Sequence, residues 1–197
     1  MVTTPLLRGP QARVPVLCLA GFMGSGKTTV GTLLARQLAW RFVDLDERIE
    51  ESAGLKIPEI FERLGEPAFR QIEADQLRAA LGRASEQEGT VLALGGGTYA
   101  QPGCPDFLRM SNAPVLWLDS PVEILLTRCM TMTGRPLFRD ESSFRALYAQ
   151  RLPSYQLSDY RVDSSAEPSQ VVAEILRRGI IASGGNESHL LVEKPLP

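Results

Sequence analysis

The chain has 197 residues, of which 44% are hydrophobic and 22% are charged, and its formal net charge at pH 7 is −2. These values are typical of a globular protein and exclude both a disordered chain and a basic nucleic-acid binder. A chain of this length is expected to form one domain that buries about 70% of the surface exposed by the unfolded chain.

The cysteines and the histidine limit which metal sites and which catalytic bases the chain could form. Cys18, Cys104 and Cys129 show no zinc-ligand spacing, and an odd number cannot all pair within one chain, so they predict free thiols and a cytoplasmic protein. No stretch approaches the roughly 18 apolar residues of a membrane span. The single histidine, His189, lies in a polar stretch near the C-terminus, so any general base is expected to be a carboxylate or a lysine.

The two ends of the chain are predicted to lie outside the folded domain. Residues 1–13 contain helix-breaking Pro and Gly and are expected to form a flexible leader. Residues 182–197 show little periodicity and are expected to form a loosely ordered tail. A single domain over residues 14–181 is therefore predicted.

The stretch Gly21–Thr29 matches the phosphate-binding pattern G-x-x-x-x-G-K-[ST] without a gap. An apolar run of strand length, residues 14–20, precedes it, and apolar residues follow it at helical spacing up to about Ala39. Strand, glycine loop and helix are the arrangement that this motif requires, which disfavours the alternative of a glycine turn that merely starts a helix.

The chemistry predicted for this loop is the binding of a nucleotide. Its glycines let successive backbone N–H groups face phosphate oxygens at the positive end of the helix dipole. Lys27 is expected to reach the outer phosphates, and the Thr28 hydroxyl is expected to hold Mg²⁺. The loop residues predicted to bind ATP are Gly24, Ser25, Gly26, Lys27, Thr28 and Thr29.

Two carboxylates end the next predicted strand, residues 41–46. Ligands of an open parallel sheet bind beyond the carboxyl ends of its strands, so Asp44 and Asp46 are expected on the same rim as the glycine loop. The alternative is that Asp46 only caps the helix predicted to begin at Glu47.

Three short helices are predicted next, over residues 47–53, 58–64 and 67–83, because prolines mark helix starts and glycines mark helix ends. In the third helix, Arg70 and Glu73 are three residues apart and share one face. Their default interpretation is a surface ion pair.

The third apolar strand, residues 91–94, runs directly into Gly95-Gly96-Gly97. Three glycines at the carboxyl end of a buried strand cost backbone entropy and make sense where a ligand approaches the backbone closely. The alternative is a flexible turn.

The rest of the chain completes an alternating pattern. A polar, irregular segment over about residues 130–143 suits a mobile lid. The remaining predicted elements are a helix over 106–110, a strand over 115–119, a helix from Pro121, a helix over 144–152, a strand over 160–163 and a helix from Pro168. Five strands alternating with helices predict an α/β fold with a three-layer, doubly wound, five-stranded parallel sheet.

Six motifs follow one another along the chain: Gly21 to Thr28, Asp44-x-Asp46, Phe69-Arg70-x-x-Glu73, Gly95-Gly96-Gly97, Arg135-Pro136 and Arg151-x-x-x-Tyr155. Over roughly residues 14–180 this series closely resembles the shikimate kinase family, in the nucleoside-monophosphate-kinase-like branch of P-loop proteins. The resemblance implies a P-loop kinase with a mobile lid. It also implies MgATP-dependent phosphorylation of the 3-hydroxyl of shikimate, in chorismate and aromatic amino-acid biosynthesis.

The resemblance further implies which residues bind the acceptor. It assigns this binding to the helices of about residues 46–83 and to residues later in the chain. Arg70 and Arg151 look like the family's clamp on the shikimate carboxylate. Gly96 and Gly97 would bring backbone N–H groups against the substrate. Asp46 matches the carboxylate that binds ring hydroxyls and accepts the attacking proton.

On the nucleotide side, Asp44 resembles the residue that holds Mg²⁺ through water, with Thr28 as the direct ligand. Lys27 and the lid residue Arg135 would stabilise the transferred phosphoryl group. Together with the proton acceptor Asp46, they are the predicted catalytic residues. Arg128 matches a position that packs against adenine, although an exposed helix arginine is an equally good interpretation. Arg128 and Arg135 are both predicted to contact ATP.

Two departures from the family's pattern stand near the site. The glycine triplet is followed by Thr98-Tyr99, where small or aliphatic residues are more usual, and Trp40 precedes the second strand. Tyr99 either lines the substrate pocket or packs outside it.

Two rival functions remain open at this stage. One is a kinase for another small polar acceptor, such as gluconate or a nucleoside monophosphate, and the other is a nucleotide-binding module without chemistry. A GTPase switch is disfavoured because the chain has no N-K-x-D sequence. Shikimate and ATP are the expected small-molecule partners of a monomer that binds neither nucleic acid nor membrane.

Overall fold

The computed structural model describes residues 16–82, 89–130 and 140–180. The predicted leader, most of the predicted lid including Arg135, the predicted tail and His189 lie outside the described residues. The described elements, in chain order, are β1 (Val16–Ala20), α1 (Lys27–Leu38), β2 (Arg41–Asp44), α2 (Leu45–Ala53), α3 (Ile57–Gly82), β3 (Thr90–Ala93), α4 (Cys104–Met110), β4 (Val115–Asp119), α5 (Val122–Met130), α6 (Glu141–Tyr155), β5 (Tyr160–Asp163) and α7 (Pro168–Arg177).

The strands form a five-stranded sheet in the order β2-β3-β1-β4-β5, and every neighbouring pair is parallel. The chain runs outward from β1 to β2, returns through β3, and then crosses to β4 on the other side. The strand order therefore reverses at β1, which is the place where open α/β sheets bind ligands. The predicted doubly wound parallel sheet is confirmed.

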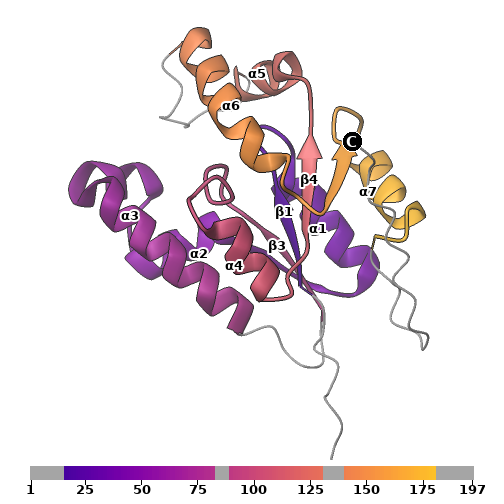
Figure 1. Cartoon of the computed structure of the whole chain (residues 1–197), viewed down its shortest axis with the longest axis horizontal. Coiled ribbons are helices and arrows are strands. Elements are labelled where there is room, and N and C mark those ends of the chain that lie inside the picture. The colour runs from indigo at the N-terminus through magenta and orange to yellow at the C-terminus, as the bar shows by residue number, and fades with distance from the viewer. Residues whose placement is uncertain (1–15, 83–88, 131–139, 181–197) are drawn as a thin grey trace, which may run out of the picture.

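Helices cover both faces of the sheet and give three layers (Figure 1). On one face, α1 and α7 bury Leu34 and Ile175 against Leu17 and Leu19 of β1. On the other face, residues of α2 to α6 form a larger apolar cluster with the opposite side of the same strands. Side chains of β1 enter both clusters because successive residues of a strand point to opposite faces.

The end of β2 differs from the sequence prediction. The strand stops at Asp44, and α2 begins at Leu45, so the prediction of a strand through residue 46 is wrong. A helix cap is present, but the capping residue is Asp44, whose carboxylate accepts a hydrogen bond from the backbone N–H of Asp46 at 3.0 Å. Asp46 therefore lies in the first turn of α2, one residue beyond the fully buried Leu45.

The three helices predicted between residues 47 and 83 are present. Gly54, at φ 64°, ends α2. Gly65 interrupts α3 with φ 79° and ψ 169°, and Pro67 follows it, so α3 is two helices joined at a kink. A left-handed φ of this kind suits glycine, which has no Cβ to clash.

Helix α6 extends beyond its predicted end at residue 152. It passes through Pro153 and ends at Tyr155, which brings Tyr155 one turn beyond Arg151 on the same face. None of the helices in the described residues combines the length and the apolarity that a membrane crossing requires.

Candidate active site

The glycine loop lies between β1 and α1 and fits its surroundings closely. A Cβ on Gly21 would lie 2.6 Å from Oγ of Ser25 and 2.8 Å from the carbonyl oxygen of Leu118. Such contacts are too short for any side chain. The loop ends at Gly26, the N-cap of α1, which has no side chain to accept bonds from the first-turn amides. This helix start is therefore suited to an anion.

The side chain of Lys27 folds back along the loop. Its Nζ donates to the carbonyl oxygens of Gly21 at 2.8 Å and Phe22 at 3.1 Å. Both acceptors belong to the loop itself, so the ammonium group is held beside the surface that the loop presents to phosphate.

The two residues predicted to hold Mg²⁺ lie in contact. The Thr28 hydroxyl donates to Oδ2 of Asp44 at 2.8 Å, and the other carboxylate oxygen accepts the amide of Asp46. Within the described residues no group of three or more His, Cys, Asp or Glu side chains is placed to hold a metal by itself. One hydroxyl and one carboxylate fit Mg²⁺, which keeps several waters and takes its remaining ligands from phosphates.

Arg128 is not an exposed helix arginine. Its Nη1 donates to the carbonyl oxygens of Gly24, at 3.3 Å, and Ser164, at 3.0 Å, and its Nη2 donates to that of Ser165 at 3.0 Å. The side chain is half-buried between the glycine loop and the turn after β5. Arg128 thus joins these two loops beside the nucleotide side of the site.

Asp46 lies beside the first glycine of the triplet. A Cβ on Gly95 would lie 2.6 Å from Oδ1 of Asp46 and 2.8 Å from Oγ1 of Thr98. The carboxylate therefore occupies the space that a side chain at this position would fill. Because Asp44 and Asp46 open the same helix, they stand on the same rim as the glycine loop, as predicted.

Arg70 of α3 and Arg151 of α6 converge on Gly97. A Cβ on this glycine would lie 3.0 Å from Nη2 of Arg151 and 3.5 Å from Nη1 of Arg70. A side chain there would displace the guanidinium groups, so the triplet is a site of close approach and not a free turn. Two cations that meet over exposed backbone form a binding place for a carboxylate.

The carbonyl oxygen of Gly96 ties the triplet to α6. It accepts from Nη1 of Arg151 at 3.0 Å and from the hydroxyl of Tyr155 at 2.6 Å. Burial raises the pKa of Tyr155, so its hydroxyl stays protonated and remains a donor. The ring of Tyr155 stacks on Trp117 of β4, with centroids 6.0 Å apart.

Tyr155 and Phe22 are site residues for which the sequence predicted no role. Phe22 is 1% exposed, and the guanidinium carbon of Arg151 lies 5.6 Å from its ring centroid. The ring also packs edge-on against Phe144 of α6. The sequence signal for Tyr155 was its place in the motif Arg151-x-x-x-Tyr155, whose spacing puts both side chains on one helix face, and no comparable signal pointed to Phe22.

The ion pair of Arg70 and Glu73 exists, but it is not a surface pair. Nη1 of Arg70 lies 2.8 Å from Oε2 of Glu73, whose side chain is only 4% exposed. The other carboxylate oxygen accepts the hydroxyl of Thr98 at 2.6 Å. Glu73 is buried because α3 packs this face toward the turn that follows the glycine triplet.

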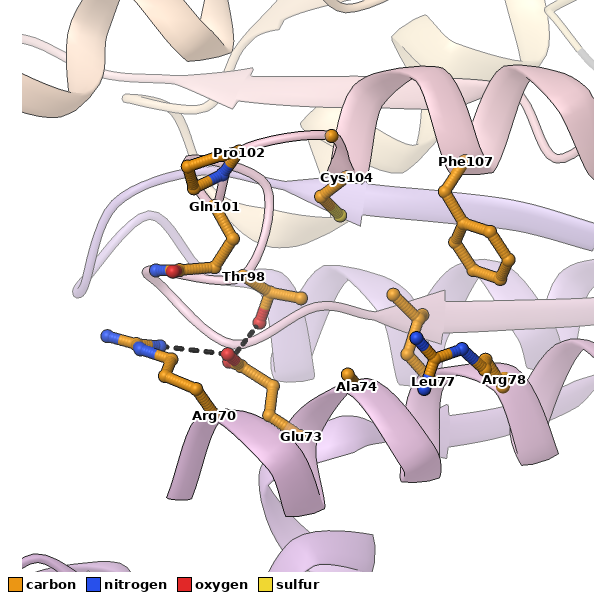
Figure 2. Close-up of a pocket in the computed structure, with 11 residues that line it drawn as sticks. Arg70, Glu73, Ala74, Leu77, Arg78, Thr98, Gln101, Pro102, Cys104 and Phe107 are labelled. Carbon is orange, nitrogen blue, oxygen red and sulfur yellow. Dashed lines mark hydrogen bonds and ion pairs between the residues drawn. The ribbon is translucent and has the colours of Figure 1, made fainter. Parts of the chain in front are cut away.

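A cavity of about 300 Å³ lies beside this pair, between α3 and the segment that leads into α4 (Figure 2). Thr98, Glu73 and Cys104 are among its lining residues. Burial raises the pKa of Cys104 to about 12, so the thiol is a neutral wall group. Tyr99 does not line this cavity; it is 2% exposed and belongs to the core cluster.

Trp40 and the three cysteines lie in the core or at the far end of the sheet. The indole of Trp40 covers Gly89, where a Cβ would lie 2.1 Å from the ring, so it packs at the amino-terminal end of β3, away from the site. All three cysteines are free, as predicted, and the structure shows that they are also buried.

Comparisons with known proteins find one family in both sequence and structure. The sequence profile of the shikimate kinase family matches residues 23–179. A shikimate kinase of Sulfurihydrogenibium sp. is 40% identical over 162 residues, which is 81% of this chain and 95% of that protein. The structure of shikimate kinase from Acinetobacter baumannii in complex with shikimate superimposes with a TM-score of 0.75 at 34% identity, covering 85% of this chain and 93% of that one. A gluconokinase from Sinorhizobium meliloti, with a TM-score of 0.57 at 20% identity over 84% of this chain and 92% of that one, shares the fold alone.

Proposed function

The chain belongs to the shikimate kinase family, and we propose that the residues described above divide its reaction between a nucleotide half and an acceptor half. The protein is an ATP-dependent kinase that phosphorylates shikimate. The two rival functions, a kinase for another small acceptor and a nucleotide-binding module without chemistry, are therefore rejected. The observation that carries the division is the meeting of Arg70 and Arg151 over Gly97, with Asp46 beside Gly95.

In the acceptor half, Arg70 and Arg151 bind the carboxylate of shikimate, and the backbone of Gly96 and Gly97 lies against the ring. Two guanidinium groups give strong, charge-assisted bonds to a carboxylate. What supports this arrangement is that each arginine is already held, Arg70 by Glu73 and Arg151 by the carbonyl oxygen of Gly96. A preorganised clamp loses little side-chain freedom when it binds.

Asp46 is proposed to orient the 3-hydroxyl of shikimate and to accept its proton as the hydroxyl oxygen attacks the γ-phosphorus. The leaving group is the β-phosphate oxygen of ADP. A carboxylate is the expected base because no histidine lies in the described residues. Its place in the first turn of α2, beside the glycine triplet, puts it between the acceptor and the nucleotide loop.

In the nucleotide half, the amides of residues 24–29 and the ammonium group of Lys27 bind the phosphates of ATP. Thr28 and, through water, Asp44 would hold Mg²⁺, which neutralises phosphate charge when bound. On binding, Lys27 exchanges its bonds to the carbonyl oxygens of Gly21 and Phe22 for bonds to phosphate oxygens. Arg128, which bonds to the carbonyl oxygen of Gly24 in the glycine loop, is proposed to contact the nucleotide beside this loop.

Arg135 and the lid of about residues 130–143 are proposed, from the family resemblance, to cover the transferred phosphoryl group when both substrates are bound. A lid that excludes water protects the γ-phosphoryl group from hydrolysis. If so, protease cleavage within residues 131–139 should slow when ATP and shikimate are both present, and equal cleavage with and without them would contradict the lid.

We also propose a cytoplasmic monomer with no nucleic-acid or membrane partner. The free cysteines support a reducing compartment, and the net charge of −2 supports the absence of a polyanion partner.

The test of the proposed site is ADP release in the presence of shikimate, compared for the wild type, Asp46→Asn and Arg70→Ala. We expect Asp46→Asn to lower kcat by about 10² to 10⁴, the range found for general bases, with ATP affinity retained. Arg70→Ala should raise the KM for shikimate and leave the KM for ATP within about 2-fold, because it removes a contact to the acceptor alone. Near-normal turnover of Asp46→Asn would overturn the role of this carboxylate.

A further inference from the structure

Thr98 makes an unusual contact for a residue next to a glycine-rich ligand site. Its hydroxyl donates its single proton to Oε1 of Glu73 at 2.6 Å, and both residues are buried, at 2% and 3% exposure. A buried carboxylate is costly unless its oxygens are bonded. Glu73 meets this requirement with Thr98 on one oxygen and Arg70 on the other.

The bond from Glu73 determines which end of Arg70 faces the acceptor. Nη1 of Arg70 is the atom that Glu73 holds at 2.8 Å, and of the Arg70 atoms it lies nearest to the position that a Cβ on Gly97 would take, at 3.5 Å. The other nitrogens, Nε and Nη2, bond to Glu66, whose side chain is 63% exposed. An exposed ion pair contributes little to fixing a side chain. The buried bond to Glu73 is therefore the one that orients the guanidinium group.

Thr98 is itself fixed to the glycine triplet. Its amide donates to the carbonyl oxygen of Gly95 at 3.1 Å, and its carbonyl oxygen accepts the amide of Gln101 at 3.1 Å. These bonds form the tight turn that also presents Gly96 and Gly97. The relay from Thr98 through Glu73 to Arg70 thus sets the position of Arg70 relative to the same backbone against which the acceptor lies (Figure 2).

The cavity beside the relay explains why the hydroxyl matters. Helix α3 packs mainly against α2, and a space of about 300 Å³ separates it from the segment that leads into α4. Glu73 borders this space, so its carboxylate has room to turn away from the turn at Thr98. Without the hydroxyl, Glu73 would lose its fixed position, and Arg70 would follow it.

We propose that Thr98 is a positioning residue, which sets the affinity of the enzyme for the carboxylate of shikimate by holding Glu73 and, through it, Arg70. This inference rests on the proposed role of Arg70 in the acceptor half. It assigns a function to Thr98, one of the residues at which this chain departs from the family's pattern.

The test compares Thr98→Val, which removes only the hydroxyl, with Thr98→Ser, which keeps it. Loss of a hydrogen bond to a charged group predicts a rise of about 10-fold in the KM for shikimate in Thr98→Val, with kcat and the KM for ATP within about 3-fold of wild type. Thr98→Ser should behave as wild type. Thr90→Val is the matched control, because Thr90 is a buried threonine at the opposite end of β3, and it should leave all three constants unchanged.

A double-mutant cycle with Arg70→Ala separates this inference from the proposed function. In the Arg70→Ala background, Thr98→Val should change the KM for shikimate by less than about 2-fold, since its effect passes through Arg70. If Arg70→Ala weakens shikimate binding but Thr98→Val does not, or if the two effects multiply in full, the inference fails while the clamp stands. If Arg70→Ala itself leaves the KM for shikimate unchanged, both fail.

A second variant covers the case in which Thr98→Val lowers the melting temperature more than Thr90→Val does. Glu73→Gln keeps the size of the side chain and an acceptor for Thr98 but removes the charge that holds Arg70. It should raise the KM for shikimate by a similar factor of about 10. An unchanged KM in Glu73→Gln would overturn the relay.

Discussion

The nucleotide half and the acceptor half of the site are built in different ways. In the nucleotide half, the glycine loop bonds to itself over short distances in sequence, as when Lys27 reaches the carbonyl oxygen of Gly21 six residues away, and Arg128 is the long-range addition. In the acceptor half, Arg151 reaches Gly96 across 55 residues and Thr98 reaches Glu73 across 25. The glycine loop itself needs one strand, one loop and one helix, whereas the acceptor half needs α3, α6 and the turn after β3 to be docked correctly.

This difference predicts that substitutions in the two halves will have separable effects on the kinetics of the enzyme. Substitutions in the glycine loop should change the chemical step and the handling of ATP, while small shifts in the packing of α3 or α6 should change the affinity for shikimate first. Phe22 is the exception, because it lies in the glycine loop and packs under Arg151. The following substitutions test the separation, from the largest expected effect to the smallest.

Lys27→Met should affect only the nucleotide half. It removes a cation from the transferred phosphoryl group, and we expect kcat to fall by about 10² to 10³. Shikimate binding, measured by calorimetry, should stay within about 2-fold of wild type, because Lys27 bonds to carbonyl oxygens of the glycine loop and is expected to act on the phosphates. Lys56→Met is the control, because the side chain of Lys56 is 74% exposed and pairs with Glu50 in a salt bridge. A parallel loss of shikimate affinity in Lys27→Met would break the separation.

Gly97→Ala should affect only the acceptor half. The new methyl group would lie 3.0 Å from Nη2 of Arg151 and would push the flexible end of this side chain aside. Because misplacing a binding group by a fraction of an ångström weakens it strongly, we expect the KM for shikimate to rise by about 10-fold or more, with ATP binding unchanged.

Gly82→Ala is the matched control for this substitution. A Cβ on Gly82 would meet nothing within 4 Å, so the same chemical change should leave both KM values as they are. Unaltered shikimate kinetics in Gly97→Ala would show that the close approach to Arg151 is irrelevant to the acceptor.

Tyr155→Phe should give the smallest effect. It removes one of the two donors to the carbonyl oxygen of Gly96 and leaves that of Arg151 in place. We expect the free energy of unfolding, measured in urea, to fall by about 1 kcal/mol and the KM for shikimate to rise by about 2-fold. Tyr148→Phe, on the same helix, serves as the control. A 10-fold rise in KM would mean that the tie between α6 and the glycine triplet, and not the clamp alone, controls the acceptor.

The same contrast explains how far the sequence could predict the molecule. The glycine loop, the strands and the helix ends at Gly54 and Gly65 are determined by local chemistry, and the structure contains them close to the predicted positions. The small error at the end of β2 is also local: Asp44 bonds to the amide two residues on and starts the helix early, which the pattern of two aspartates does not reveal.

In the acceptor half, the arginine clamp was predictable only through the resemblance to a family. Nothing in the spacing of Arg70 and Glu73 shows that Glu73 is buried, because an i,i+3 pair looks the same on a surface. The bond of Glu73 to Thr98 joins a helix to a turn 25 residues away and depends on how α3 lies over the sheet. The same holds for the hydroxyl of Tyr155, whose acceptor lies 59 residues away.

The stack of Trp117 on Tyr155 provides an optical signal for the acceptor half. Trp117 contacts the ring whose hydroxyl holds the carbonyl oxygen of Gly96, so its fluorescence should respond when a ligand moves the glycine triplet. The chain has two tryptophans, and the other, Trp40, covers Gly89 at the far end of β3, where it supplies a steady background. We therefore expect Trp117 to act as a spectroscopic reporter of shikimate binding, which a fluorescence titration at equilibrium, without turnover, coupling enzymes or a label, would check.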